Sequence, residues 1–271
     1  MNKKKIVIVG GGFAGITCAK KLQRKFNVIL IDKKDYFEYT PGILRVVVEP
    51  EHLNKIHINY KEILKESHFL KNTVTEVSKK FVVAGEKKIF YDYLIISTGS
   101  QYSSLKGFKK AIQISSGDYL AKCYDRLKKS KNILIIGGGF TGVELAGEIT
   151  TKYPDKNLTI TDTKRLMPRM DQNAGDYAKK FLKKRNVQII LNEKIIKSSK
   201  NLFETDKKTR ILADLIFVCT GMKSNTKILE KNFSEFLERD GLIKVNSCLQ
   251  LIGNPNIFAA GDITDINEEK T

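Results

Sequence analysis

Short apolar runs separated by polar stretches dominate the chain. The first run is followed by a glycine-rich turn, a helical pattern and a second apolar run: a strand over Lys5–Val9, a helix from about Ala14 to Arg24, and a strand over Val28–Ile31. None of the runs approaches the roughly 20 residues of a membrane span. The strand–turn–helix–strand order predicts parallel βαβ units and an α/β fold.

The same pattern recurs in the second half of the chain. An apolar strand over Ile133–Ile136 precedes a glycine turn, a helix from about Thr141 to Thr151, and a strand over Leu158–Thr161. A later strand is repeated as well, since residues 91–99 (YDYLIISTG) resemble residues 213–221 (ADLIFVCTG). Two similar nucleotide-binding domains are the simplest explanation of this duplication.

Between the repeats, the alternation of residues 72–90 predicts a β-meander, and a similar meander is expected over 187–212. Stretches 99–117 and 225–241 have the composition of linkers, and 242–271 return to the first domain. We therefore expect the second domain to be inserted into the first. The predicted boundaries are 1–112 for the first part of the first domain, 113–231 for the second domain, and 232–271 for the return segment.

The four cysteines are scattered and show no metal-ligand spacing, so we expect no metal site. We expect Cys18, Cys123, Cys219 and Cys248 to be reduced and packed as small apolar residues. The three histidines lie outside both glycine turns and are expected at the surface: His52, His57 and His68.

The net charge of +18 comes mostly from lysines that are spread along the whole chain. A solvated basic surface explains this, and weak attraction to acidic lipid head groups or anionic cofactors is the alternative. No aromatic residues are interleaved with the lysines as in a single-strand platform, so we expect no nucleic-acid partner. The N-terminus shows no signal-peptide pattern. We expect a cytoplasmic protein, with peripheral membrane contact at the inner face of the membrane left open.

The first glycine motif is Gly10-x-Gly12-x-x-Gly15, placed between a strand and a helix. The first glycine permits a tight turn, the second lets the backbone approach a pyrophosphate, and the third packs the helix against the strand. The helix N-terminus then offers N–H groups to the phosphates. Asp32 ends the next strand, where a carboxylate accepts from ribose hydroxyls. This context predicts a dinucleotide site.

The second motif, Gly137-x-Gly139-x-x-Gly142, repeats the device, and Asp162 ends its next strand. A carboxylate there fits a free 2′-hydroxyl and repels a 2′-phosphate, which favours NADH. Residues 163–165 (TKR) follow immediately and would instead favour a phosphate, so NADPH stays an alternative.

A last motif, residues 256–262 (NIFAAGD), is a strand that runs into Gly261-Asp262. Together the motifs resemble those of flavoproteins with two dinucleotide-binding domains, and most closely the apoptosis-inducing-factor-like, ferroptosis-suppressor-like branch near the type II NADH dehydrogenases. The resemblance covers the whole chain. It is carried by residues 35–45 (DYFEYTPGILR), 48–50 (VEP), 91–99, 137–148 (GGGFTGVELAGE), 260–265 (AGDITD) and 269–270 (EK).

The resemblance implies two doubly wound Rossmann-like domains, the first binding FAD and the second NAD(P)H. It implies that FAD contacts residues of the first domain and its return segment, and that NAD(P)H contacts residues of the second. For FAD these are Gly10, Gly12, Phe13, Ala14, Gly15, Asp32, Lys33, Thr98, Gly99, Gly261 and Asp262. For NAD(P)H they are Gly137, Gly139, Gly142, Asp162 and Gly221.

Two catalytic residues follow from the same resemblance. Glu144 matches a glutamate near the flavin–nicotinamide contact, although a charge favoured by the dipole on the first helical turn is the alternative. Lys270 matches a lysine beside the isoalloxazine. Family members reduce a quinone or a similar acceptor. Reduction of a small redox protein of ferredoxin or rubredoxin type, and a non-catalytic FAD-binding role, are the alternatives.

Two departures from the family pattern matter. The stretch Glu38–Val48 has no cysteine where disulfide reductases carry a pair, so thiol–disulfide chemistry is not expected. The chain ends one residue after Lys270, where relatives continue into a C-terminal domain that often forms a homodimer or a membrane contact. We therefore expect an incomplete enzyme in which hydride transfer survives better than quinone reduction.

Overall fold

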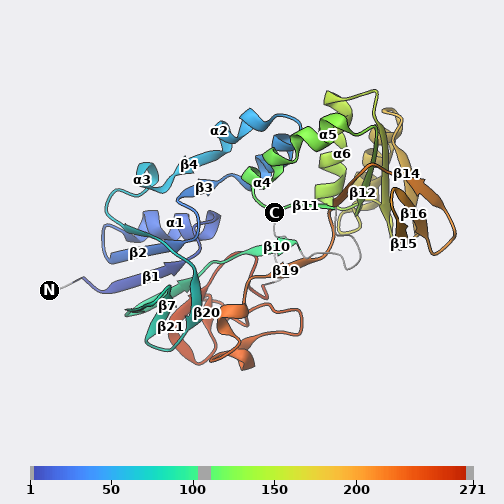
Figure 1. Cartoon of the computed structure of the whole chain (residues 1–271). Coiled ribbons are helices and arrows are strands. Elements are labelled where there is room, and N and C mark those ends of the chain that lie inside the picture. The colour runs from blue at the N-terminus through green and yellow to red at the C-terminus, as the bar shows by residue number, and fades with distance from the viewer. Residues whose placement is uncertain (1–2, 103–110, 267–271) are drawn as a thin grey trace. The chain divides into compact units, whose positions relative to one another are not determined.

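A computed structural model describes residues 3–102 and 111–266 (Figure 1). The chain forms two compact units. As far as they are described, the first comprises Met1–Tyr39, His57–Gln101 and Lys223–Thr271, and the second comprises Thr40–Ile56 and Tyr102–Met222. Each unit is therefore assembled from segments that are distant in sequence.

The first unit is built on a six-stranded sheet in the order β20-β21-β9-β1-β2-β5. All neighbouring strands run parallel except the β20–β21 pair. The predicted strand Lys5–Val9 is confirmed, and the one predicted over Val28–Ile31 extends by one residue at each end. The strands are β1 (Lys5–Val9), β2 (Asn27–Asp32), β5 (His68–Lys71), β9 (Tyr93–Ile96), β20 (Gln250–Leu251) and β21 (Asn254–Ala259).

Alternate residues of β1 point to opposite faces of this sheet. Ile6 and Ile8 pack with Ile16 and Ala19 of α1 (Phe13–Leu22). On the other face, Val7 packs with the valines of an antiparallel meander, β6 (Val74–Val77), β7 (Phe81–Ala84) and β8 (Lys87–Phe90). Figure 1 shows α1 and β7 on the two sides of β1. The α/β class is confirmed, but a meander covers the face where a doubly wound domain carries further helices.

A short hairpin of β3 (Tyr36–Glu38) and β4 (His57–Asn59) flanks this sheet, followed by α3 (Tyr60–Ile63). Its register sets Glu38 opposite His57, and the imidazole Nε2 lies 2.9 Å from Oε2 of the buried Glu38 carboxylate. The His57 side chain is 17% exposed, so this residue is half-buried rather than fully at the surface as expected. The unit is completed by two short 3-10 helices, η3 (Lys227–Leu229) and η4 (Ser234–Phe236).

The second unit contains a five-stranded parallel sheet in the order β11-β18-β12-β13-β14. The meander expected over 187–212 begins only at residue 195, because β14 pairs with β13 in the parallel sheet. The parallel strands are β11 (Ile112–Gln113), β12 (Asn132–Ile136), β13 (Asn157–Asp162), β14 (Gln188–Leu191) and β18 (Leu215–Val218). The meander comprises β15 (Ile195–Ser199), β16 (Leu202–Thr205) and β17 (Arg210–Leu212).

The meander packs on one face of the second sheet. Helices and one excursion of the chain pack on the other face. The helices are α4 (Gly117–Lys122), α5 (Tyr124–Lys129), α6 (Phe140–Lys152) and α7 (Gln172–Lys183). The excursion, which we call the arm, is Thr40–Ile56 and contains η1 (Thr40–Val47), η2 (Pro50–His52) and α2 (Leu53–Ile56). Two strands lie where the chain passes between the units, β10 (Ser100–Tyr102) and β19 (Met222–Ser224).

All four cysteines are free thiols, and Cys123 and Cys219 are buried as expected. Cys248 is exposed, so the expectation that it packs in the core is wrong. Within residues 3–102 and 111–266, no group of three or more His, Cys, Asp and Glu residues could hold a metal ion. The described helices are all too short or too polar to cross a membrane.

Candidate functional site

The candidate FAD-binding residues gather at one edge of the first sheet. Because β1, β2, β9 and β21 run parallel, their carboxyl ends meet at the same edge. Gly10 follows β1, Asp32 ends β2, Thr98 lies two residues beyond β9, and Gly261 lies two residues beyond β21. β1 lies between β2 and β9, where the strand order reverses, which is where open α/β sheets bind ligands.

The first glycine turn has the shape that the motif predicts. Gly10 adopts a φ of +100°, and a Cβ on Gly15 would lie 1.8 Å from the Gly10 carbonyl oxygen, so neither position accepts a side chain. A Cβ on Gly12 would enter open space instead. Gly12 is the N-cap residue of α1. Because glycine has no side chain, it cannot cap the N–H groups of the first helical turn. The turn fits a pyrophosphate that approaches Gly12.

Two side chains hold this turn. The Asp32 carboxylate accepts hydrogen bonds from Gly11 N–H at 2.6 Å and from Lys34 N–H at 2.8 Å, one on each oxygen. The buried Tyr60 hydroxyl donates to the Gly11 carbonyl at 2.9 Å, and burial raises the pKa of this hydroxyl. Tyr60 was not identified from the sequence, because nothing local in residues 57–63 signals a contact with a turn 49 residues away.

The loop after β9 is fastened to the segment that returns from the second unit. Thr98 Oγ1 donates to the Asn225 carbonyl at 2.8 Å, Asn225 Nδ2 donates to the Thr98 carbonyl at 2.9 Å, and Asn225 N–H donates to the Gly99 carbonyl at 2.9 Å. The Thr98 hydroxyl therefore holds the loop. Asn225 is a second residue that the sequence did not reveal.

The remaining residues lie around the same edge. Ser100 Oγ donates to the exposed Asp262 carboxylate at 3.1 Å. A Cβ on Gly261, whose φ is +87°, would lie 3.4 Å from the Ala14 Cβ, so the closing motif lies against the first turn of α1. Phe13 and Lys33 are exposed beside them.

The second unit repeats this geometry with its own residues. Gly137 has a φ of +117°, a Cβ on Gly142 would lie 1.8 Å from the Gly137 carbonyl oxygen, and a Cβ on Gly139 would meet nothing within 4 Å. The Asp162 carboxylate accepts from Gly138 N–H and Lys164 N–H, both at 2.7 Å. Gly221 lies beyond the end of β18 at the same edge, with a φ of +76°. This turn fits a second pyrophosphate.

One donor differs between the two copies. The carbonyl of the middle glycine accepts from the Tyr60 hydroxyl in the first unit, but Gly138 accepts from Met167 N–H at 2.8 Å in the second. Arg165 belongs to the segment 163–165 that would favour a 2′-phosphate. Its guanidinium donates to four backbone carbonyls, those of Leu166, Met167, Met170 and Asp171. Its guanidinium is therefore engaged in holding the loop that leads into α7, whereas Lys164 is exposed.

Glu144 lies on the second turn of α6, since the helix begins at Phe140. The dipole effect expected for a first-turn carboxylate is therefore reduced. Protein on one side of this solvent-exposed side chain removes part of its hydration and raises the pKa of the Glu144 carboxyl, and the negative charge of Glu148 raises it further. Nearby on the same unit, the Tyr102 hydroxyl lies 2.5 Å from Thr141 Oγ1. Lys270 lies outside the described residues.

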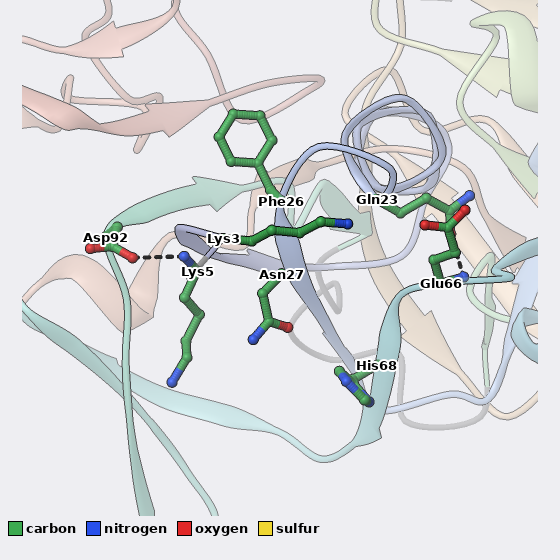
Figure 2. A pocket seen from close by; sticks show the side chains of 8 residues that line it. All are labelled: Lys3, Lys5, Gln23, Phe26, Asn27, Glu66, His68 and Asp92. Atoms are coloured by element: carbon green, nitrogen blue, oxygen red, sulfur yellow. Dashed lines mark hydrogen bonds between the residues drawn. The ribbon is translucent and has the colours of Figure 1, made fainter. Parts of the chain in front are cut away.

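A hollow in the first unit lies at the opposite edge of its sheet (Figure 2). It is lined by residues at the amino ends of the strands, including Lys5 of β1, Asn27 of β2 and His68 of β5. Lys5 N–H donates to the Asp92 carboxylate there at 2.6 Å, as Figure 2 shows. This hollow is therefore separate from the glycine turn.

The comparisons with known proteins agree with this geometry. Residues 4–270 match the family described as pyridine nucleotide-disulphide oxidoreductase. The chain belongs to this family. Apoptosis-inducing factor homolog B of Dictyostelium discoideum is 36% identical over the whole chain and 77% of its own length. Human ferroptosis suppressor protein 1 is 32% identical over 98% of the chain and 75% of its own length.

Among solved structures, the NDH2 of Plasmodium falciparum in complex with NADH has the same fold, with a TM-score of 0.86 at 23% identity. The match covers 97% of this chain but 64% of that structure, so the chain spans somewhat less than two thirds of it. Pyridine nucleotide-disulphide oxidoreductases bind FAD and NAD(P)H, and the two glycine turns described above fit two such dinucleotides.

Proposed function

We propose that the chain is an FAD-dependent NAD(P)H oxidoreductase that delivers electrons to a quinone-type acceptor. The observation that carries this proposal is the duplicated glycine turn. Each unit has a glycine turn of the same geometry at the carboxyl edge of its own parallel sheet, and each turn is held by a carboxylate that accepts from the middle glycine. Two dinucleotides in one chain are what hydride transfer between cofactors requires.

The first unit is the FAD-binding unit in this proposal, because its turn is joined at the same edge by Thr98-Gly99 and Gly261-Asp262. The second binds the pyridine nucleotide. When bound, the nicotinamide supplies a hydride and the flavin accepts it and passes both electrons to the acceptor. The protein's part is to bind and orient the two dinucleotides, and Glu144 and Lys270 are proposed to act beside the reacting rings.

The quinone-type acceptor rests on the resemblance to the ferroptosis-suppressor-like and type II NADH dehydrogenase branch. A small acidic redox protein is the second candidate acceptor, because the net charge of +18 favours an acidic partner. Asp162 favours NADH over NADPH in this proposal, and the engagement of Arg165 with backbone carbonyls leaves Lys164 as the nearer candidate for a phosphate.

Two matched alanine variants test the assignment of the units. Gly12 and Gly139 both have extended backbones with negative φ, and a Cβ at either position meets nothing, so Gly12→Ala and Gly139→Ala are unstrained without a ligand. We expect Gly12→Ala to lose FAD and still bind NADH. We expect Gly139→Ala to stay yellow but to resist reduction by NADH.

The measurement is an anaerobic NADH titration of FAD-reconstituted protein, followed through the flavin absorption band, with NADH binding by calorimetry. The expected wild-type result is bleaching with one NADH per flavin. A wild-type protein that stays colourless in added FAD, or that stays yellow in excess NADH and NADPH, contradicts the proposed function. Exchanged effects of the two variants would reverse the assignment of the units.

A further inference from the structure

The arm is the long connection of a hairpin in the first unit, yet it packs in the second. The chain leaves β3 at Glu38 and returns in β4 at His57, and these strands pair with each other. Between them, η1 buries its apolar side chains among α4 and α6 of the second unit. The buried side chains are Ile43, Leu44, Val46 and Val47.

Two ion pairs join the arm to α6. The Arg45 guanidinium grips Glu148, with Nε 3.2 Å from Oε1 and 3.3 Å from Oε2, and Nη2 3.1 Å from Oε1. Lys152 Nζ lies 3.2 Å from Glu49 Oε1. Each of the two elements thus contributes one positive and one negative side chain, four residues apart.

This pattern of charges specifies one register of the arm along α6. A shift of the arm by one helical turn towards the C-terminus of α6 sets Arg45 beside Lys152, and a shift in the opposite direction sets Glu49 beside Glu148. Either shift replaces an attractive pair by a repulsive one, although the second shift also brings Arg45 beside Glu144. The two ion pairs therefore discriminate against both neighbouring registers.

Glu144 lies one turn before Glu148 on α6. Among residues 3–102 and 111–266, the charged and titratable groups that act on it are Glu148 on its own helix and the Tyr102 hydroxyl from β10. Arg45 bears on Glu144 through Glu148, because its positive charge offsets the negative charge that Glu148 presents to Glu144.

We propose that Arg45 is a positioning residue of the pyridine-nucleotide site, which holds Glu148 one helical turn from Glu144 and so sets the charge that faces Glu144; this rests on the proposed function. Stability alone is a poor explanation for the grip. The Arg45 side chain is 51% exposed, and exposed ion pairs contribute little to folding. The grip has a more specific consequence, because an unpaired Glu148 would act on Glu144 at full charge.

The first experiment needs no cofactor. The chain is labelled with ¹³C at the glutamate carboxyl carbon, Glu144 is assigned with Glu144→Gln, and its carboxyl is titrated by NMR. We expect Arg45→Met to raise the pKa of Glu144, because Glu148 is left unpaired. In Glu148→Gln, and in the double variant Arg45→Met with Glu148→Gln, we expect a pKa of Glu144 below that in Arg45→Met. Arg45→Lys should restore most of the wild-type value.

The matched control is Lys152→Met, which breaks the neighbouring ion pair but leaves the grip on Glu148 intact. It should leave the titration of Glu144 unchanged. Thermal unfolding of every variant separates lost structure from altered titration. An Arg45→Met protein that folds and titrates Glu144 as the wild type does would overturn the proposal, as would an equal shift in Lys152→Met.

The second experiment measures flavin reduction by NADH against pH in the FAD-reconstituted protein. The limb of the pH profile that disappears in Glu144→Gln should move upward in Arg45→Met and return in Arg45→Lys. If NMR shows the shift but this limb does not move, the role of Arg45 at the nucleotide site is wrong while the proposed function stands. A wild-type flavin that NADH does not reduce is instead a failure of the proposed function.

Discussion

At the scale of single residues, the two equivalent aspartates carry different predictions although they make the same hydrogen bonds. Asp32 and Asp162 each accept from the middle glycine N–H of their turn and from the N–H two residues further along the chain. Each carboxylate therefore shapes its glycine turn. Each oxygen keeps a second lone pair for a ribose hydroxyl.

Replacing Asp32 by alanine should weaken FAD binding by about 10- to 100-fold. Two backbone N–H groups lose a charged acceptor, and the loss of such an interaction costs about 1–3 kcal/mol. Equilibrium dialysis of FAD against the purified variant measures the effect. Asp35→Ala is the control, because Asp35 lies three residues away and pairs with the exposed Lys71. Equal FAD affinity in the two variants would contradict the role of Asp32.

Replacing Asp162 by asparagine should erode the preference for NADH. Asparagine keeps an oxygen for the Gly138 N–H but removes the charge that repels a 2′-phosphate, so we expect the NADPH-to-NADH ratio of kcat/KM to rise by roughly tenfold or more. Flavin reduction at subsaturating nucleotide measures this ratio. In the control Lys164→Met the ratio should not rise. A wild-type protein that already prefers NADPH would show that the assignment is wrong.

Single residues also differ in how well their roles could be predicted from the sequence. The glycines and aspartates could be identified because their spacing is local and their roles follow from backbone geometry. Tyr60 and Asn225 could not, since their partners lie 49 and 127 residues away. The half-buried position of His57 could not be predicted either, because its contact with Glu38 arises from strand pairing across the arm.

At the scale of elements, the loop after β9 depends on a clasp. Three hydrogen bonds join Thr98 and Gly99 to Asn225. Asn225→Ala removes the side-chain donor and leaves the Thr98 carbonyl without that partner. We therefore expect the FAD dissociation constant to rise by about tenfold, the equivalent of one typical hydrogen bond.

Stopped-flow release of FAD from the Asn225→Ala protein tests this expectation. Asn256→Ala is the matched control, since Asn256 Nδ2 makes a single long hydrogen bond of 3.4 Å to the Asp92 carbonyl at the other edge of the sheet. Faster release in both variants would point to general loosening of the sheet rather than to the clasp.

Strands and helices bounded by glycine were predicted to within a residue or two, because apolar runs of five or six residues leave few alternatives. The predicted helix over 141–151 extends by one residue at each end as α6, and the meander over 72–90 is confirmed. That the arm packs in the second unit could not be predicted from the sequence. Its apolar residues find partners in α4 and α6, far along the chain, and the ion pairs that hold it join residues 103 apart.

At the scale of the whole molecule, the net charge of +18 distinguishes the two candidate acceptors. Reduction of a small acidic redox protein should slow several-fold between 50 and 500 mM salt, since added salt screens attraction between opposite charges. Reduction of an uncharged quinone should not change over the same range. Steady-state assays with NADH and each acceptor give the comparison, and a salt-independent rate with the acidic protein would remove the electrostatic argument for it.

The arm also bears on how the polypeptide is made. Four aliphatic residues of the arm emerge early from the ribosome: Ile43, Leu44, Val46 and Val47. Their partners on α4 and α6 emerge only after roughly 75 to 105 further residues have been synthesised. Until then the nascent chain carries four aliphatic side chains within five positions whose native partners have not yet been made. Residues 102–222 folded alone would leave the apolar side chains of α4 and α6 that pack against the arm uncovered. The gene segment for that unit is therefore not a transferable module, and an early apolar segment must be kept from misassociation until its partners arrive.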